Sequence, residues 1–220
     1  MKKLILLAAT VFSVCFSSSK VKGQDIISKK GYTLTFESNN SSFDPALKEV
    51  LIKTFFKVYP KLAKEYNKNT SKEVKFLIDT AYKGVAATGG GKVVFSSNYM
   101  EKHPQDIDVV THEVMHIVQN YGRSGGPGWL TEGIADYARF KFGVNNEGAK
   151  WALPAYKAGQ SYTNSYRITA AFFNWLETNQ HKGIVKKLDS QLRQHTYSAE
   201  SWKNLTGKTL DELWASYAKG

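Results

Sequence analysis

The sequence predicts a single α+β domain in which a small sheet with its first helices is followed by a mainly helical C-terminal half. The chain has 220 residues, of which 42% are hydrophobic and 13% aromatic, enough for one domain with a substantial core. Alternating apolar residues, typical of strands, occur in the first half of the chain. From about residue 104 the apolar spacing is helical, and we find no internal repeat or long linker.

The chain begins with the features of a secretory signal peptide. Lys2 and Lys3 precede an uncharged apolar run over residues 4–16. This run is shorter than the ~20 residues of a bilayer-spanning helix and fits the core of a signal peptide, about 7–15 residues. We expect residues 1–23 to be a signal peptide and residues 24–220 to be a secreted, periplasmic or cell-envelope domain. The alternative is an uncleaved N-terminal anchor; no later segment has the composition of a transmembrane helix.

The chain is basic, with a formal net charge of +11. Loss of the signal peptide would remove four lysines and no acid, so +11 becomes +7, and would also remove Cys15, the only cysteine. An exported domain without disulfides must be held together by packing, helped in some proteins by a metal. Positive charge attracts anionic polymers, but the lysines are scattered and no nucleic-acid recognition motif accompanies them. We therefore expect no specific nucleic-acid partner and favour a solvated basic surface, with anionic surface polymers as the alternative partners.

Three strands are predicted before residue 100, at residues 32–36, 74–78 and 92–96. Gly89-Gly-Gly91 predicts a turn before the third strand. The third strand, with Val93-Val-Phe95 at its centre, admits two interpretations. It is either the sheet edge along which an extended peptide adds as a further strand, or an ordinary core strand.

A helix is predicted after Asp44-Pro45, with Asp44 as the N-cap and Pro45 as the first helical residue. We expect Pro60 to break or restart this helix before Tyr66, because proline removes a backbone donor. Further helices are predicted at residues 105–121, 129–141, 167–180, 183–194 and 209–218. The large apolar residues near the C-terminus are assigned to the core: Phe172, Phe173, Trp175, Leu176, Trp202, Leu205, Leu210, Leu213 and Trp214.

The helix at residues 105–121 carries a candidate metal site. Its apolar stripe consists of Val110, Val114, Ile117, Val118 and Tyr121. His112, Glu113 and His116 fall on roughly the opposite side. Residues four apart are neighbours on a helix surface, so both imidazoles can approach one ion with the Glu113 carboxylate beside it. A catalytic zinc site needs a third protein ligand and an open position for water.

The next predicted helix offers that third ligand. It follows a glycine-bearing loop, and its core stripe leaves Glu132 and Asp136 together on the opposite face. We assign Glu132 as the third ligand and Asp136 as the acceptor of a ligand-histidine N–H. The alternatives are the reverse assignment, or two solvated surface carboxylates. Because position 119 is glutamine and position 122 is glycine, the three-histidine metzincin motif is excluded.

These motifs resemble those of the basic secretory protein family, zinc peptidases of plants and bacteria related to the glutamate-ligand zincins (gluzincins). The resemblance lies in His112-Glu-Val-Met-His116 with Gln119 and in Glu132-Gly-Ile-Ala-Asp136-Tyr137, and extends to residues 89–100 and 166–172. In the last segment, Ala171 stands where arginine is usual. The resemblance implies a zincin fold: a twisted sheet over the active-site helix, with the third ligand of one Zn²⁺ on a following helix.

The chemistry expected of such a site is peptide-bond hydrolysis through a metal-bound water, with Glu113 as the general base. Tyr166 is the candidate donor to the tetrahedral oxyanion, and Tyr162 is the alternative. The remaining three histidines are expected on the surface: His103, His181 and His195. A non-catalytic zincin-fold protein that binds anionic glycans or envelope polymers is the alternative function. A structural metal site is disfavoured because it usually takes four closed ligands with cysteine among them.

Overall fold

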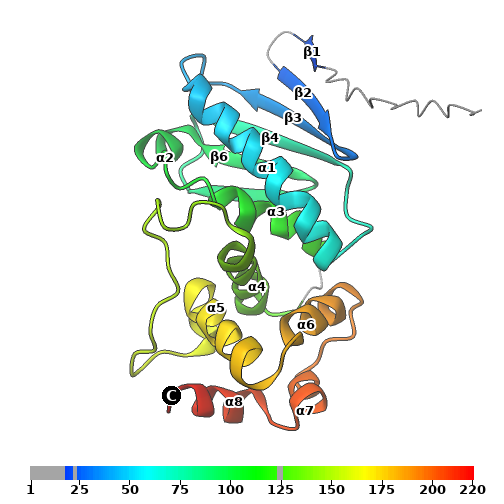
Figure 1. Ribbon diagram of the computed structural model, residues 1–220, viewed down its shortest axis with the longest axis vertical. Helices are drawn as coiled ribbons and strands as arrows, with labels where there is room; N and C mark the ends of the chain where they lie inside the picture. The colour runs from blue at the N-terminus through cyan, green and yellow to red at the C-terminus, as the bar shows by residue number, and fades with distance from the viewer. Residues whose placement is uncertain (1–17, 22–23, 123–125) are drawn as a thin grey trace, which may run out of the picture.

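The computed structural model describes residues 18–21, 24–122 and 126–220, which form a six-stranded mixed sheet and a set of helices (Figure 1). The strands lie in the order β1 (Ser18–Val21), β2 (Gln24–Lys29), β3 (Tyr32–Ser38), β4 (Glu73–Asp79), β6 (Lys92–Ser96) and β5 (Ala86–Gly89). β3, β4 and β6 are parallel, and the remaining neighbours pair antiparallel. The α+β class is therefore confirmed. Apart from β1, the predicted signal peptide at residues 1–23 lies outside the described residues.

Alternation along the central strands places one row of apolar side chains in the core. Every second residue of β3 and β4 is buried, and the register sets Phe36 beside Phe76 and Phe76 beside Val93. The Phe76 ring packs edge-on against Phe95 at 5.0 Å and against Phe55 of the covering helix at 5.5 Å. Because side chains alternate across a strand, this pattern fixes which face of the sheet receives the helices.

The covering helix, α1 (Pro45–Glu65), begins as predicted, since the Asp44 side chain accepts the amide of Ala46 at 2.8 Å. The predicted break at Pro60 is wrong, because the helix continues through it. Proline cannot donate to the carbonyl four residues earlier, that of Phe56. That carbonyl instead accepts the Lys30 ammonium at 3.3 Å. A side chain from the β2–β3 turn thus takes the place of the missing donor.

The structure adds three strands that were not predicted, β1, β2 and β5. β5 joins β6 through Gly90 and Gly91, both with positive φ (56° and 74°), so the predicted glycine turn is a two-residue hairpin. β6 pairs with β4 on one side and β5 on the other. Reading Val93-Val-Phe95 as the sheet edge is therefore wrong. The edge is β5, and the core-strand interpretation is confirmed.

The helices after residue 96 are α2 (Ser97–Lys102), α3 (Val109–Gln119), α4 (Gly128–Phe142), α5 (Tyr166–Trp175), α6 (Ile184–Arg193), α7 (Glu200–Thr206) and α8 (Leu210–Tyr217). α2 and α7 were not predicted, and α5 passes into a π-helical turn at Leu176–Gln180. In Figure 1, α3 lies between the sheet and the helical half, α4 follows, α5 and α6 lie at about one level, and α7 and α8 are farthest from the sheet.

The helical half is held by aromatic packing. Phe172, Phe173 and Trp202 are fully buried and their rings lie within about 6.4 Å of one another, which confirms their assignment to the core. Trp175, Leu205, Leu210 and Trp214 pack against this core while partly buried. No helix in the described ranges combines the length and the apolar character that crossing a bilayer requires.

Candidate metal centre and cleft

Two histidines of α3 form one side of the site. Val110, Val114 and Val118 are fully buried on the packing stripe, which turns His112 and His116 toward the helical half of the molecule. Their Nε2 atoms lie 3.2 Å apart. The helix ends at Asn120 in the left-handed conformation, so the chain can turn back at once toward α4.

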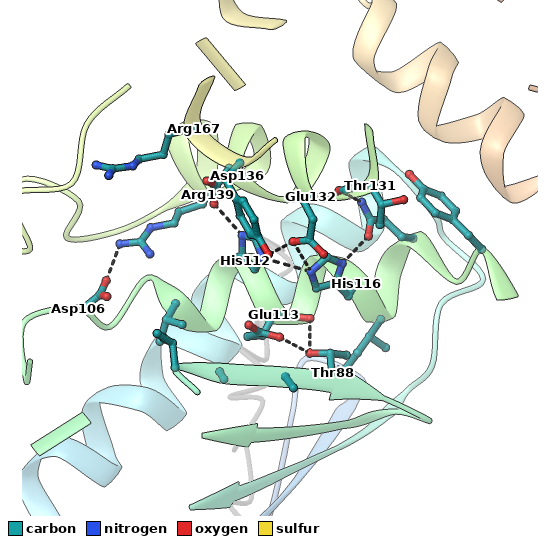
Figure 2. Close-up of a pocket in the computed structure, with 18 of the residues that line it drawn as sticks. Thr88, Asp106, His112, Glu113, His116, Thr131, Glu132, Asp136, Arg139 and Arg167 are labelled. Carbon is teal, nitrogen blue, oxygen red and sulfur yellow. Dashed lines mark hydrogen bonds and ion pairs between the residues drawn. The ribbon is translucent and has the colours of Figure 1, made fainter. Parts of the chain in front are cut away.

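The third side chain, Glu132, comes from α4. Leu130 and Ile134 are fully buried and direct Glu132 from the other face of the helix toward the histidines (Figure 2). Its Oε2 atom lies 3.2 Å from Nε2 of His112 and 3.5 Å from Nε2 of His116. One donor atom from each of the three residues lies within 4.8 Å of the others. The side chains predicted as ligands therefore meet, although residue 132 is far from residue 112 along the chain.

Asp136 lies behind His112 rather than among the three converging atoms. Its Oδ1 atom lies 2.7 Å from His112 Nδ1, and the side chain is only 5% exposed. A carboxylate at this distance accepts the Nδ1 proton and leaves Nε2, on the other side of the ring, facing Glu132 and His116. The geometry therefore favours the assignment of Glu132 as ligand and Asp136 as outer partner over the reverse.

Gln119 has the corresponding place behind His116, a role that sequence reasoning missed. Its side-chain oxygen lies 2.7 Å from His116 Nδ1, and its amide nitrogen donates to the carbonyl of Thr131 at 2.9 Å. Gln119 thus links the last turn of α3 to the residue just before Glu132. The available signal was its spacing, three residues after His116 on one helix, where side chains are surface neighbours.

The carboxylates create a strongly negative environment around His112. Burial alone would lower the pKa of His112, but hydrogen bonds to Asp136 and Glu132 outweigh it and raise the pKa from 6.5 to about 10. Burial alone would raise the pKa of Glu132, but hydrogen bonds from both histidines lower it to about 2. The site therefore favours positive charge between these groups, whether a proton or a metal cation supplies it.

Glu113 faces the sheet edge from the same helix. It is 6% exposed, and its Oε2 atom accepts the hydroxyl of Thr88 on β5 at 2.6 Å. The Thr88 hydroxyl also lies 3.0 Å from the Glu113 backbone carbonyl. β5 thus holds the Glu113 carboxylate below the histidine pair (Figure 2). Sequence reasoning missed Thr88, since the strand that carries it was not predicted.

These groups line one cleft of about 1410 Å³. β5 contributes one wall through Ala86 to Thr88, and α3 contributes the histidines and Glu113. The opposite wall includes Glu132, Tyr166 and Arg167. The cleft thus lies beside β5, an edge strand of the sheet.

Tyr166 stands at this opposite wall, at the start of α5. The centroid of its ring lies 6.2 Å from that of the His112 ring, and the two ring planes are 18° apart. The residue is 54% exposed. The pKa of its hydroxyl is raised, mainly by the negative charge of Glu132. Ser165 and Tyr166 both have left-handed φ values, 67° and 50°. Consecutive non-glycine residues in that region are strained, and such strain is concentrated at functional sites.

The other sequence candidates lie elsewhere. The Tyr162 hydroxyl donates to Asp211 at 2.8 Å, and Tyr162 does not line the cleft. His103 and His195 are exposed and His181 is partly exposed; none belongs to the histidine–glutamate cluster. Ala171, at the position where the family usually has arginine, is 8% exposed and packs within α5.

The mixed sheet, the paired histidines of α3 and the glutamate of the following helix define a zincin-like protein with a candidate metal site. The chain belongs to the BSP family, peptidases of plants and bacteria, whose sequence profile matches residues 23–217. This confirms the resemblance to the basic secretory protein family. A comparison with curated proteins finds none that matches.

Among solved structures, the chain is similar to a two-domain M1 zinc metallopeptidase mutant bound to L-tryptophan, with a TM-score of 0.52 and 13% identity. That match covers 93% of this chain and 50% of the other, so the chain spans half of its length. An M1 zinc metallopeptidase from Deinococcus radiodurans gives a TM-score of 0.47, 11% identity, and coverage of 93% and 50%. At such low identity the first likeness supports the zincin-like fold alone.

Proposed function

We propose that this protein is a secreted zinc-dependent peptidase in which His112, His116 and Glu132 hold the metal and Glu113 is the general base. The observation that carries the proposal is the convergence of the three donor atoms within 4.8 Å beside a buried glutamate in an open cleft. Secretion is supported by the sequence of residues 1–23.

The donor set fits zinc. Two imidazole nitrogens and one carboxylate oxygen are the ligands of many catalytic zinc sites, which use three protein ligands and keep a position open. Both histidines are oriented by acceptors at Nδ1, Asp136 and Gln119, as ligand histidines usually are. The site opens onto a cleft, whereas a structural zinc site is closed by a fourth protein ligand.

When bound, zinc supplies Lewis acidity toward the scissile carbonyl and makes water more acidic. Glu113 then accepts the proton of the attacking water at its carboxylate and delivers it to the leaving amine, so that the amine departs neutral. Thr88 keeps this carboxylate in place through its hydroxyl, 2.6 Å away. A buried base held by one hydrogen bond loses little freedom when the substrate arrives.

Tyr166 acts as the second electrophilic group. Its hydroxyl, raised in pKa by the charge of Glu132, stays protonated at neutral pH and can donate to the carbonyl oxygen as negative charge develops. Its exposed position at the cleft wall allows it to approach a bound peptide. The substrate lies along the free edge of β5, whose residues Ala86 to Thr88 line the cleft.

The alternative function, a non-catalytic protein that binds anionic polymers, relies on a different surface. Lys53, Lys57, Lys61 and Lys64 are all exposed along α1. Binding there would need neither a general base nor a set of metal ligands. Glu113 therefore distinguishes the two functions, because only the peptidase requires it.

The test is to purify the protein, measure bound zinc, and assay a mixed peptide library with and without a chelator. We expect Glu113→Ala to abolish cleavage while it largely retains zinc, because its carboxylate is not among the three donors. Glu49→Ala, which removes an exposed glutamate of α1 outside the cleft, is the matched control and should cleave like the wild type. Equal cleavage by Glu113→Ala and the wild type would overturn the proposed mechanism.

A further inference from the structure

One end of the cleft carries a cation that its surroundings do not neutralise. Arg167 lines the cleft beside Tyr166, and its side chain is exposed. Within the described part of the chain, no residue forms an ion pair or hydrogen bond with its guanidinium. Figure 2 shows Arg167 on the same side of the metal ligands as Arg139, at the end of the site away from His116.

An acidic residue at this end of the cleft, Asp106, already has other partners. Asp106 accepts Arg139 Nη2 at 2.5 Å with one oxygen and the hydroxyl of Tyr99 at 2.6 Å with the other. Arg139 in addition donates to Asn146 at 3.2 Å and lies over the Trp151 ring at 4.4 Å. Asp106 and Arg139 thus neutralise each other, and among the described residues neither forms an ion pair or hydrogen bond with Arg167.

A second cation lines the cleft in a loop that the fold holds firmly, beside Trp151, whose ring lies against Arg139 at this end. The buried Asp108 carboxylate accepts the backbone amides of Val144 at 2.8 Å and Asn145 at 2.5 Å. Lys150 follows in this loop with a left-handed φ of 52°, and its side chain has no described hydrogen-bond or ion-pair partner. Arg167 and Lys150 therefore both line the cleft without an ion-pair partner among the described residues.

We infer that this end of the cleft is a subsite for a substrate carboxylate, with Arg167 as the principal specificity determinant and Lys150 as a supporting charge. The inference rests on the proposed function, because it places a peptide in the cleft. A guanidinium presents paired donors that match the two oxygens of a carboxylate. A bound peptide would also exclude water from the cleft and strengthen the attraction. The carboxylate is either an Asp or Glu side chain or the C-terminus of the substrate.

The test measures binding to the Glu113→Ala protein loaded with zinc, so that cleavage does not interfere. Three fluorescein-labelled octapeptides of one sequence are compared: an amidated peptide with a central Gln, the same peptide with Glu, and the Gln peptide with a free C-terminus. We expect one carboxylate peptide to bind about tenfold more tightly than the neutral one, the scale of one charge-assisted hydrogen bond. Which of the two binds more tightly identifies the source of the carboxylate.

Variants then assign the preference to Arg167. Arg167→Ala should bring the ratio of affinities close to one, Arg167→Lys should restore part of it, and Arg167→Glu should favour an amidated peptide with a central Lys. Lys61→Ala, which removes an exposed lysine of α1, is the matched control and should keep the preference. Only a direct contact predicts the reversal, since a structural role of Arg167 would weaken all peptides alike.

The inference is overturned if no carboxylate peptide binds more tightly than the neutral one, if no peptide binds, or if the preference survives Arg167→Glu. The wild-type protein separates this result from the proposed function. Cleavage of peptides without a charge preference would overturn only the subsite. A carboxylate preference in binding, together with no cleavage of any peptide, would overturn the peptidase and leave the subsite intact.

Discussion

The two candidate ligand histidines have unequal support, and this difference predicts unequal effects on zinc affinity. His112 Nδ1 faces the Asp136 carboxylate at 2.7 Å, whereas His116 Nδ1 faces the neutral Gln119 side chain at the same distance. A hydrogen bond to a charged group contributes about 1.5–3 kcal/mol, against about 0.5–1.5 kcal/mol between neutral groups. Loss of an outer partner typically weakens metal binding by about 10–100-fold.

From these values we expect Asp136→Ala to weaken zinc binding by about 100-fold. Asp136→Asn keeps the side-chain volume and one oxygen acceptor but loses the negative charge. This replaces a charged hydrogen bond by a neutral one, which costs about 1 kcal/mol and should weaken zinc binding about fivefold relative to the wild type. Gln119→Ala removes a neutral partner of His116 and should also cost about fivefold. The ranking follows from the charge of each partner, since the two distances are equal.

The assay is competition for zinc between each variant and a chromophoric chelator at pH 7.4, with Glu49→Ala as the control carboxylate outside the cleft. Circular dichroism of each variant at the same temperature establishes that the fold is retained. If Gln119→Ala lowered zinc affinity as much as Asp136→Ala, or if Asp136→Ala bound zinc like the wild type, the assignment of outer partners would be wrong.

Three further perturbations follow from other contacts. Thr88→Val should lower kcat about tenfold and leave the zinc content unchanged, because it removes the 2.6 Å hydrogen bond to Glu113. Thr88→Ser should retain activity. If Thr88→Val lost zinc with no specific effect on kcat, this role of Thr88 would be wrong. Gly133→Ala should reduce the free energy of unfolding by about 1–3 kcal/mol, since the added Cβ would lie 2.3 Å from Thr169 Cγ2; an unchanged urea midpoint would contradict this packing. Burial raises the pKa of Tyr59 from 10.0 to about 12, so the unfolded chain loses this proton first and stability should fall between pH 10 and 12. Tyr59 should contribute a loss of about 1.4 kcal/mol in the free energy of unfolding per pH unit over this range. In urea titrations, Tyr59→Phe should not show this contribution.

The sequence by itself determined the α+β class, the two helices of the site and their inward faces. These features depend on spacing along one chain segment. Side chains at i and i+4 lie together on any helix, and an apolar stripe fixes which face is turned away from the core. The structure brings His112 and His116 together with Glu132 and sets Asp136 behind His112, whereas their roles as ligands and outer partner stay proposals.

Only the tertiary structure decided how separate segments complete one another. The sheet edge is β5, whose short Ala-Ala-Thr-Gly sequence has no apolar alternation, so neither the edge nor Thr88 beside Glu113 was predictable. Helix α1 continues through Pro60, and Lys30 donates to the Phe56 carbonyl that proline leaves without a helical donor. Asp106 pairs with Arg139, and Arg167 lines the cleft without an ion-pair partner among the described residues. Each of these depends on a partner distant in sequence, and local propensity and periodicity contain no information about such partners.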